Sequence, residues 1–337
     1  MPVARHFHLF TVLAASIGLA GLFSPAHAVT FTVSGAIPTG TTPLTAVLNP
    51  NCGEVYVSNS GSNSVSVIST LTDTVIATIA VGSAPDALAV SPDGSKVYVG
   101  QNGGDVSVIH TAFKRVSTIP TGGPVRDLAI TPDGTTVYVA MEGQGLKKID
   151  TKTNTVTIVS TVTCPEGVVV TPDGKYLYVN YQCFGPGGSP GHDAIGKFDA
   201  ATGAFIRGIT GFPNVGTKIT VSPDNRFVWA SDLNACSASV YDHKGCPAVP
   251  QGVVNVISTA TDSLFRSLGS TRRATVAPDG SFVVLGGSQL SLLGGSTSYK
   301  GLLNVAGSGS LAVTRGGLKA YAPVPAQDQV QVIDITK

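Results

Sequence analysis

Charged side chains make up only 12% of this 337-residue sequence, yet several of them share one position of a recurring pattern. They stand five or six positions before a recurrent turn, and the set is Asp86, Arg126, Asp127, Glu166, Lys218, Arg272 and Arg273. Basic side chains that gather in one place bind carboxylate or phosphate groups, and the guanidinium fork of arginine suits both. We therefore expect an anionic ligand here. The alternative is that these mixed charges pair among themselves.

Two histidines, His192 and His243, form a second candidate ligand pair. Each stands beside an aspartate, in Gly191-His192-Asp193 and Asp242-His243. A His/Asp pair from each loop has the chemistry to bind a metal or to exchange protons; the alternative is that they are exposed polar residues. The sequence has no CxxC pair, no CxxCH haem motif and no phosphate loop. We therefore assign no catalytic residue, no metal site and no cofactor.

The elements that position these residues follow from a repeat. A short apolar strand, a Pro-Asp-Gly turn and a Tyr-Val strand recur along the chain, with the turn position at Pro50, Pro92, Pro132, Pro172, Pro223, Pro278 and Arg315. Each unit has room for four short alternating strands, which we call A to D in chain order. Four strands in about forty residues are typical of a propeller blade. The pattern predicts an all-β fold, a seven-bladed β-propeller with four-stranded antiparallel blades.

The two ends of the chain complement each other. The last unit stops after its third strand, at Lys337, whereas the segment VTFTVSGAIPTG from Val29 resembles a strand D without a blade of its own. Because an unpaired strand edge invites association with other chains, we expect the N-terminal strand to pair in the last blade and to close the ring.

The motifs resemble those of the YVTN family of β-propellers. That family couples an SPDG turn, a YVTN-like strand and a VSVID-like strand, and the matching segments here are 91–94, 56–59 and 65–68. The resemblance extends over all seven units and is weakest in the sixth. It implies the propeller fold, but the family includes cell-surface proteins, periplasmic binders and enzyme subunits, so it does not imply one function.

An aromatic column recurs six positions after the turn position, at Tyr56, Tyr98, Tyr138, Tyr178, Trp229, Val284 and Tyr321. An aromatic stripe can serve as a ligand platform. Because each member falls in strand B of a different unit, we interpret the column as packing between adjacent blades.

Two neighbouring units carry enlarged loops between strands B and C, at 181–194 and 231–252. Antiparallel strands place loops B–C and D–A on one face of the ring, which we call the mouth face. Loops A–B and C–D lie on the other, the turn face. Loops on a rigid scaffold often carry function, so the mouth face is the expected binding face; tolerated drift of the loops is the alternative.

Four of the five cysteines fall on the predicted mouth face. In an exported chain they should form disulfides, and we favour Cys236–Cys246 and Cys164–Cys183 among the three possible pairings. Cys52 is expected to be free. A zinc site is the alternative, which no CxxC spacing supports.

The N-terminal segment 1–28 has the pattern of a secretory signal peptide: a basic start, an apolar run from Leu9 to Phe23 and a small-residue cleavage site. The predicted domains are this signal (1–28) and one propeller (29–337). We expect an exported protein, periplasmic or secreted, and a monomer without a membrane span. Its balanced charge, 21 basic and 20 acidic residues, excludes nucleic-acid binding driven by bulk charge.

The functional expectation is an exported, non-catalytic recognition or scaffold propeller that binds a protein or an anionic ligand on the mouth face. One alternative is a lactonase-like hydrolase or lyase that uses the axial pocket. Another is the propeller subunit of a periplasmic dehydrogenase.

Overall fold

The computed structural model describes residues 30–51, 53–161, 164–181, 194–210, 218–231, 253–269, 273–278, 282–286, 290–294, 299–303 and 310–336. Its regular elements are β-strands and two short 3-10 turns, η1 (Ser60–Ser62) and η2 (Pro325–Gln327). Within these ranges no helix is long and apolar enough to cross a membrane.

Six sheets are blades made of four consecutive strands that pair in chain order. The first blade contains β2–β5 (Pro43–Asn49, Glu54–Asn59, Ser64–Ser69, Thr74–Ala80). The second contains β6–β9 (Pro85–Val90, Lys96–Gln101, Asp105–His110, Arg115–Pro120). The third contains β10–β13 (Val125–Ile130, Thr136–Met141, Gly145–Asp150, Val156–Ser160).

The other three blades follow the same order. The fourth contains β14–β17 (Pro165–Val170, Tyr176–Tyr181, Ala194–Asp199, Phe205–Ile209). The fifth contains β18–β21 (Lys218–Val221, Phe227–Ser231, Val253–Ser258, Ser263–Gly269). The sixth contains β22–β25 (Arg273–Val276, Phe282–Gly286, Leu290–Gly294, Tyr299–Leu303).

A further four-stranded sheet, the closing sheet, joins both ends of the chain in the order β1-β28-β27-β26. Its strands are β1 (Thr30–Pro38), β26 (Ala312–Val313), β27 (Lys319–Val324) and β28 (Gln329–Thr336). β1 pairs antiparallel with β28 from Thr30↔Thr336 to Pro38↔Gln329. The predicted count of seven blades is therefore corrected to six blades that are continuous in sequence and one sheet shared by the two ends. The last repeat does not form a blade by itself, because it supplies only three strands.

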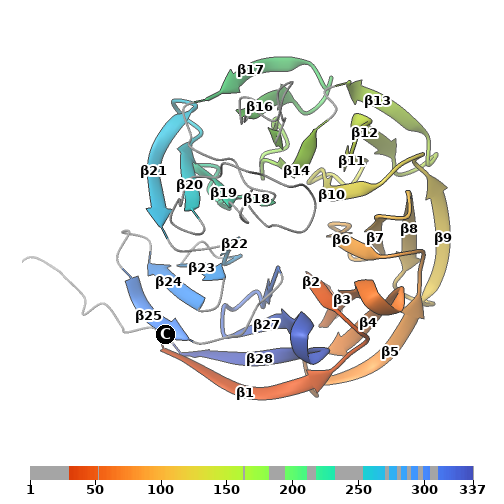
Figure 1. Ribbon diagram of the computed structural model, residues 1–337, viewed down its shortest axis with the longest axis vertical. Helices are drawn as coiled ribbons and strands as arrows, with labels where there is room; N and C mark the ends of the chain where they lie inside the picture. Colours follow the sequence, from red (N-terminus) through yellow and green to blue (C-terminus); the bar gives the residue numbers. More distant parts are fainter. Residues whose placement is uncertain are drawn as a thin grey trace, which may run out of the picture.

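The sheets stand in a ring with strand A of each blade nearest the centre and strand D outside (Figure 1). Strand B is buried almost throughout, as in β7 and β11, because it lies between two strands of its own sheet and two neighbouring blades. Strand D is the most exposed strand: β5 alternates between exposed and partly buried residues, whereas in β9 only one residue is buried.

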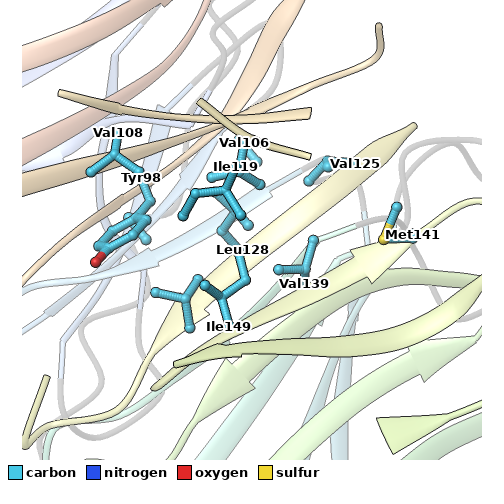
Figure 2. Packing of buried hydrophobic residues seen from close by; sticks show 12 residues of the cluster. Tyr98, Val106, Val108, Ile119, Val125, Leu128, Val139, Met141 and Ile149 are labelled. Carbon is cyan, nitrogen blue, oxygen red and sulfur yellow. The ribbon is translucent and has the colours of Figure 1, made fainter. Parts of the chain in front are cut away.

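The core lies between blades. One apolar cluster combines Tyr98 and Val106 of the second blade with Leu128, Val139 and Ile149 of the third (Figure 2). The tyrosine column behaves in the same way at the other junctions: Tyr56 packs with the second blade, Tyr138 with the fourth and Tyr321 with the first. These rings are fully buried. The interpretation of the column as inter-blade packing is confirmed.

The Pro-Asp-Gly turns are closed by their own side chains. In the second blade Asp93 accepts hydrogen bonds from the Ser91 hydroxyl at 2.5 Å and from the Ser95 backbone N–H at 3.0 Å. Gly94 has a positive φ of 68°, a conformation that glycine adopts at little cost. The aspartate is therefore part of the turn, and the hydrogen bonds that it accepts hold its pKa below the ordinary value.

Candidate binding site: the axial cluster

Five charged side chains of three neighbouring blades meet where strand A begins. Arg126 and Asp127 belong to β10, Glu142 follows β11, Glu166 belongs to β14 and Lys218 opens β18. We call this set the axial cluster. Four of its members were predicted as site residues, and the inner strands of the third, fourth and fifth blades bring those four together (Figure 1).

Lys218 joins the fifth blade to the third. Its ammonium group lies 3.3 Å from Oδ1 of Asp127 and donates to the backbone carbonyl of Arg126 at 3.3 Å. The other oxygen of Asp127 accepts from the backbone N–H of Val168, in the fourth blade, at 3.2 Å. Both charged side chains are only 15% exposed. A single carboxylate therefore holds three blades in register at the centre of the ring.

Arg126 lies between two glutamates. Its Nη2 is 2.5 Å from Glu142 Oε2, and its Nε is 4.0 Å from Glu166 Oε2. The guanidinium side chain is 34% exposed and that of Glu142 is 53% exposed. Arg126 thus presents part of its fork to solvent while carboxylates from two blades fix its orientation.

Burial changes the acidity of the cluster. Desolvation raises the pKa of the Asp127 carboxyl above its ordinary value, and the nearby Lys218 ammonium opposes this rise. Desolvation also raises the pKa of Glu166, against the attraction of Arg126 and with the repulsion of Glu142. Desolvation thus favours the protonated form of both carboxyl groups of the cluster.

Asp86 takes a different position. Its Oδ1 accepts a hydrogen bond from Thr45 Oγ1 at 3.1 Å, and its backbone carbonyl accepts from Ser58 Oγ at 2.9 Å. These contacts join the first blade to the second. Asp86 therefore belongs to the same inner ring of strands, but its recorded contacts link it to the first blade and not to the axial cluster.

The remaining predicted site residues fall largely outside the described part of the chain. Arg272, His192 and His243 lie outside the described residues, as do positions 182–193 and 232–252 of the enlarged loops. Arg273 opens β22, but its side chain is not described.

Glu142 was missed by the sequence reasoning. It follows strand B, and antiparallel pairing places the end of strand B beside the start of strand A: Val125 pairs with Met141, and Glu142 N donates to the carbonyl of Pro124 at 3.0 Å. A search for charges at both positions of each blade would have found it.

The arrangement combines three acids with two bases. The basic groups predicted to bind an anion, Arg126 and Lys218, already lie beside carboxylates, so the alternative of mutual pairing describes their geometry. Among the described residues no three His, Cys, Asp or Glu side chains are grouped to hold a metal ion. The cluster offers hydrogen-bond donors and acceptors in fixed positions, which suits recognition of a partner with charges of both signs.

Cys164 lies one residue before β14, half-buried against the apolar cluster between the third and fourth blades. Cys183, Cys236, Cys246 and Cys52 lie outside the described residues, so the favoured pairings Cys164–Cys183 and Cys236–Cys246 stay predictions.

Comparison with solved structures supports the architecture. A chain of Kuenenia stuttgartiensis hydrazine synthase is similar, with a TM-score of 0.75, 20% sequence identity and coverage of 93% of this chain and 99% of that chain. The β-propeller domain of Cps50 (Swd1) from Myceliophteria thermophila is also similar, with a TM-score of 0.74, 11% identity and coverage of 91% of this chain and 100% of that domain. This chain is a β-propeller.

No protein-family model matches the sequence of this propeller, and no curated protein does. The resemblance to YVTN propellers therefore rests only on the sequence motifs described above. Sequence identity to both solved structures is low, so the structural likeness shows the fold alone, because propellers host unrelated functions.

Proposed function

We propose that this propeller is an exported, non-catalytic recognition or scaffold protein that binds a protein or an anionic ligand on the mouth face. The observation that carries the proposal is the axial cluster. Five charged side chains of three blades lie together on the mouth face, where both enlarged loops are predicted to lie, in a chain with only 12% charged residues.

The contacts within the cluster support recognition. Arg126 is one-third exposed and oriented by two glutamates, and Glu142 is half-exposed. Groups held in place before binding lose little conformational entropy when a partner arrives. Complementary charges give specificity and fast association more than raw affinity. A partner with an acidic and a basic group side by side matches Arg126 and Glu142.

A matched pair of double variants tests the proposal. Arg126→Ala with Glu142→Ala removes an ion pair of the mouth face, and Asp173→Ala with Lys175→Ala removes the exposed pair of the turn face, whose charges are 3.9 Å apart. Proteins captured by the wild-type chain from its own periplasm or medium are quantified by mass spectrometry. A partner lost more than tenfold with the first variant and retained with the second supports the proposal. A partner that both variants retain overturns the role of the cluster.

The export part of the proposal rests on residues 1–28. Signal peptidase cleavage after Ala28 leaves a chain that begins at Val29. Mass spectrometry of the protein from the periplasmic and medium fractions measures this end, and a full-length chain in the cytoplasm contradicts export.

A second candidate function is a lactonase-like hydrolase or lyase, and the raised pKa values of Asp127 and Glu166 favour it. Turnover of a lactone panel that falls at least 100-fold in Glu166→Gln and is unchanged in Asp173→Asn supports catalysis. The third alternative is a dehydrogenase propeller subunit. Its only support is the fold that this chain shares with a hydrazine synthase chain.

A further inference from the structure

A cavity of about 240 Å³ lies between the second and third blades on the turn face. Its walls come from the Pro-Asp-Gly turns of both blades, the start of β7 and the C–D turn of the third blade; they include Asp93, Lys96, Tyr98, Asp133 and Thr151. The cavity lies on the face opposite the axial cluster. Its volume is below that of pockets for drug-sized molecules, so it suits a small ligand.

Tyr98 is fully buried, and its hydroxyl has no hydrogen-bond partner. Figure 2 shows this hydroxyl pointing away from the apolar side chains of the cluster. The other four tyrosines of the column all hydrogen-bond: Tyr56 to Glu54, Tyr138 to the carbonyl of Ala200, Tyr178 to Asp262 and Tyr321 to Asp73. An unpaired buried hydroxyl costs about 1–3 kcal/mol, so the exception at Tyr98 points to a missing group.

In the closing sheet a carboxylate occupies the equivalent place. Lys319 and Tyr321 are the first and third residues of β27, as Lys96 and Tyr98 are of β7. There, Asp73 of the first blade binds both side chains: Lys319 Nζ lies 2.6 Å from Oδ2 and Tyr321 donates to Oδ1 at 2.6 Å. One carboxylate thus satisfies the lysine and the tyrosine together.

At a second junction a carboxylate again binds a lysine and the column tyrosine, although this lysine belongs to strand C and not to strand B. Asp262 of the fifth blade accepts from Tyr178 and from Lys197 of the fourth blade, each at 3.0 Å. Asp73 and Asp262 both stand in the C–D turn with positive φ values, 53° and 50°. The carboxylate at these two junctions comes from the same turn position of the next blade.

The third blade has Asn154 at that position. Asn154 also has a positive φ of 58°, and its N–H bonds the carbonyl four positions earlier at 2.8 Å, as that of Asp73 does at 2.9 Å. Asn154 is exposed and supplies no carboxylate. Lys96 instead donates to the carbonyl of Thr151 at 3.1 Å, and no ion pair of Lys96 occurs among the described residues. The junction therefore has the lysine and the tyrosine without their acid.

We propose that this cavity binds a small carboxylate ligand whose oxygens accept from Lys96 Nζ and the Tyr98 hydroxyl, in the place that Asp73 and Asp262 fill at other junctions. Burial, with the nearby Asp93, raises the pKa of Tyr98 to about 12, so the hydroxyl keeps its proton at neutral pH. Asp93 and Asp133 also line the cavity; their carboxylates accept hydrogen bonds from Ser91 and Thr131 of their own turns and have lone pairs for a further donor. The ligand therefore carries a hydroxyl or ammonium group beside its carboxylate, as hydroxy acids and amino acids do.

The aspartates of the turns do not exclude such a ligand. At the junction of the fourth and fifth blades, the carboxylate of Asp262 coexists with the turn aspartate Asp173, whose charge also acts on Tyr178. Lys96 and Tyr98 supply the two donors that balance the ligand's charge, as Lys197 and Tyr178 do for Asp262.

Calorimetric titration with lactate, glycine and acetate, against chloride at equal ionic strength, tests the proposal on the full chain. Lactate or glycine binds more tightly than acetate, and the preference between them identifies the hydroxyl or the ammonium class. Lys96→Met and Tyr98→Phe each weaken binding at least tenfold, whereas Lys175→Met, on the same face, leaves it unchanged. Circular dichroism confirms that each variant is folded.

Asn154→Asp is the decisive variant because it supplies the missing carboxylate from the chain itself. It abolishes binding of the probes and raises the unfolding temperature of the ligand-free protein. The proposal is overturned if neither lactate nor glycine binds the wild-type chain above the chloride control. Binding that survives both Asn154→Asp and Lys96→Met overturns it as well, because the ligand then lies elsewhere.

Discussion

The tyrosine column and the axial cluster both connect neighbouring blades through polar contacts, but one recurs and the other occurs once. The column meets a different partner at almost every junction: a carboxylate at Asp73 and Asp262, an ammonium at Lys114, and a carbonyl at Ala200. The axial cluster has no such counterpart among the described blades. The column contact thus recurs with interchangeable partners, whereas the arrangement of the axial cluster occurs once among the described blades.

The largest loss of stability is expected at the buried ion pair between Lys197 and Asp262, beside the column residue Tyr178. Lys197→Met leaves the carboxylate of Asp262, 12% exposed, without its nearest cation. Removing one member of a buried pair costs about 3 kcal/mol of unfolding free energy, measured by urea denaturation. Lys148 is the matched control because it also pairs across from a column tyrosine, Tyr138, as Lys197 does from Tyr178. Equal losses in Lys197→Met and Lys148→Met would show that the ion pair contributes nothing.

A smaller loss is expected in the axial cluster. Lys218→Met removes the cation beside Asp127, which keeps its hydrogen bond from Val168 N–H. We expect a loss of about 2 kcal/mol, because both groups are mostly buried and partly compensated. Adding Asp127→Asn to Lys218→Met should recover part of this loss in a double-mutant cycle. If the two single losses simply add, the residues are not coupled and the cluster is not one unit.

The tyrosine hydroxyl groups of the column divide into those with a hydrogen-bond partner and one, that of Tyr98, without. Tyr321→Phe removes a 2.6 Å hydrogen bond to Asp73 and should cost about 1.5 kcal/mol, since bonds to charged groups are worth more than neutral ones. Tyr98→Phe removes a buried hydroxyl without a partner, so it should raise the free energy of unfolding of the ligand-free protein by about 1–3 kcal/mol. Thermal unfolding of both variants measures the contrast. A similar loss in both would mean that Tyr98 has a partner in solution.

The smallest effect concerns pH, and its sign differs between the two faces. Glu166 has a raised pKa in the folded chain, so the folded state holds its proton to higher pH, and stability falls as pH rises from the ordinary value to the raised one. Asp93 has a lowered pKa, so its contribution is present above the ordinary value and is lost as pH falls through the folded value. Unfolding temperatures between pH 3 and 7 check this. As pH rises, the unfolding temperature of Glu166→Gln should increase relative to that of wild type. The unfolding temperature of wild type should increase relative to that of Asp93→Asn.

The sequence predicted the repeated features well because each is encoded locally. The turn at Asp93 and Gly94, the buried strand B and the tyrosine column follow from residues a few positions apart. The pairing of β1 with β28 followed from two incomplete units. The axial contacts depend instead on distance through space: Lys218 reaches Asp127, 91 positions away in the chain, across an intervening blade. No local pattern encodes that reach, so the sequence placed Arg126, Asp127, Glu166 and Lys218 in one set and left open whether they bind an anion or pair among themselves.

The pairing of β1 with β28 also governs the order of events in time. Thr30 and Thr336 are partners, so one of the first described residues to be synthesised waits for one of the last. Pairings this distant in sequence slow folding, because the entropy of closing a long loop is lost before any contact is gained. The consecutive blades need no such wait, since each is complete once its own four strands are available. We therefore expect closure of the ring to be the last step of folding, and a chain that ends before β28 leaves β1 without its partner strand.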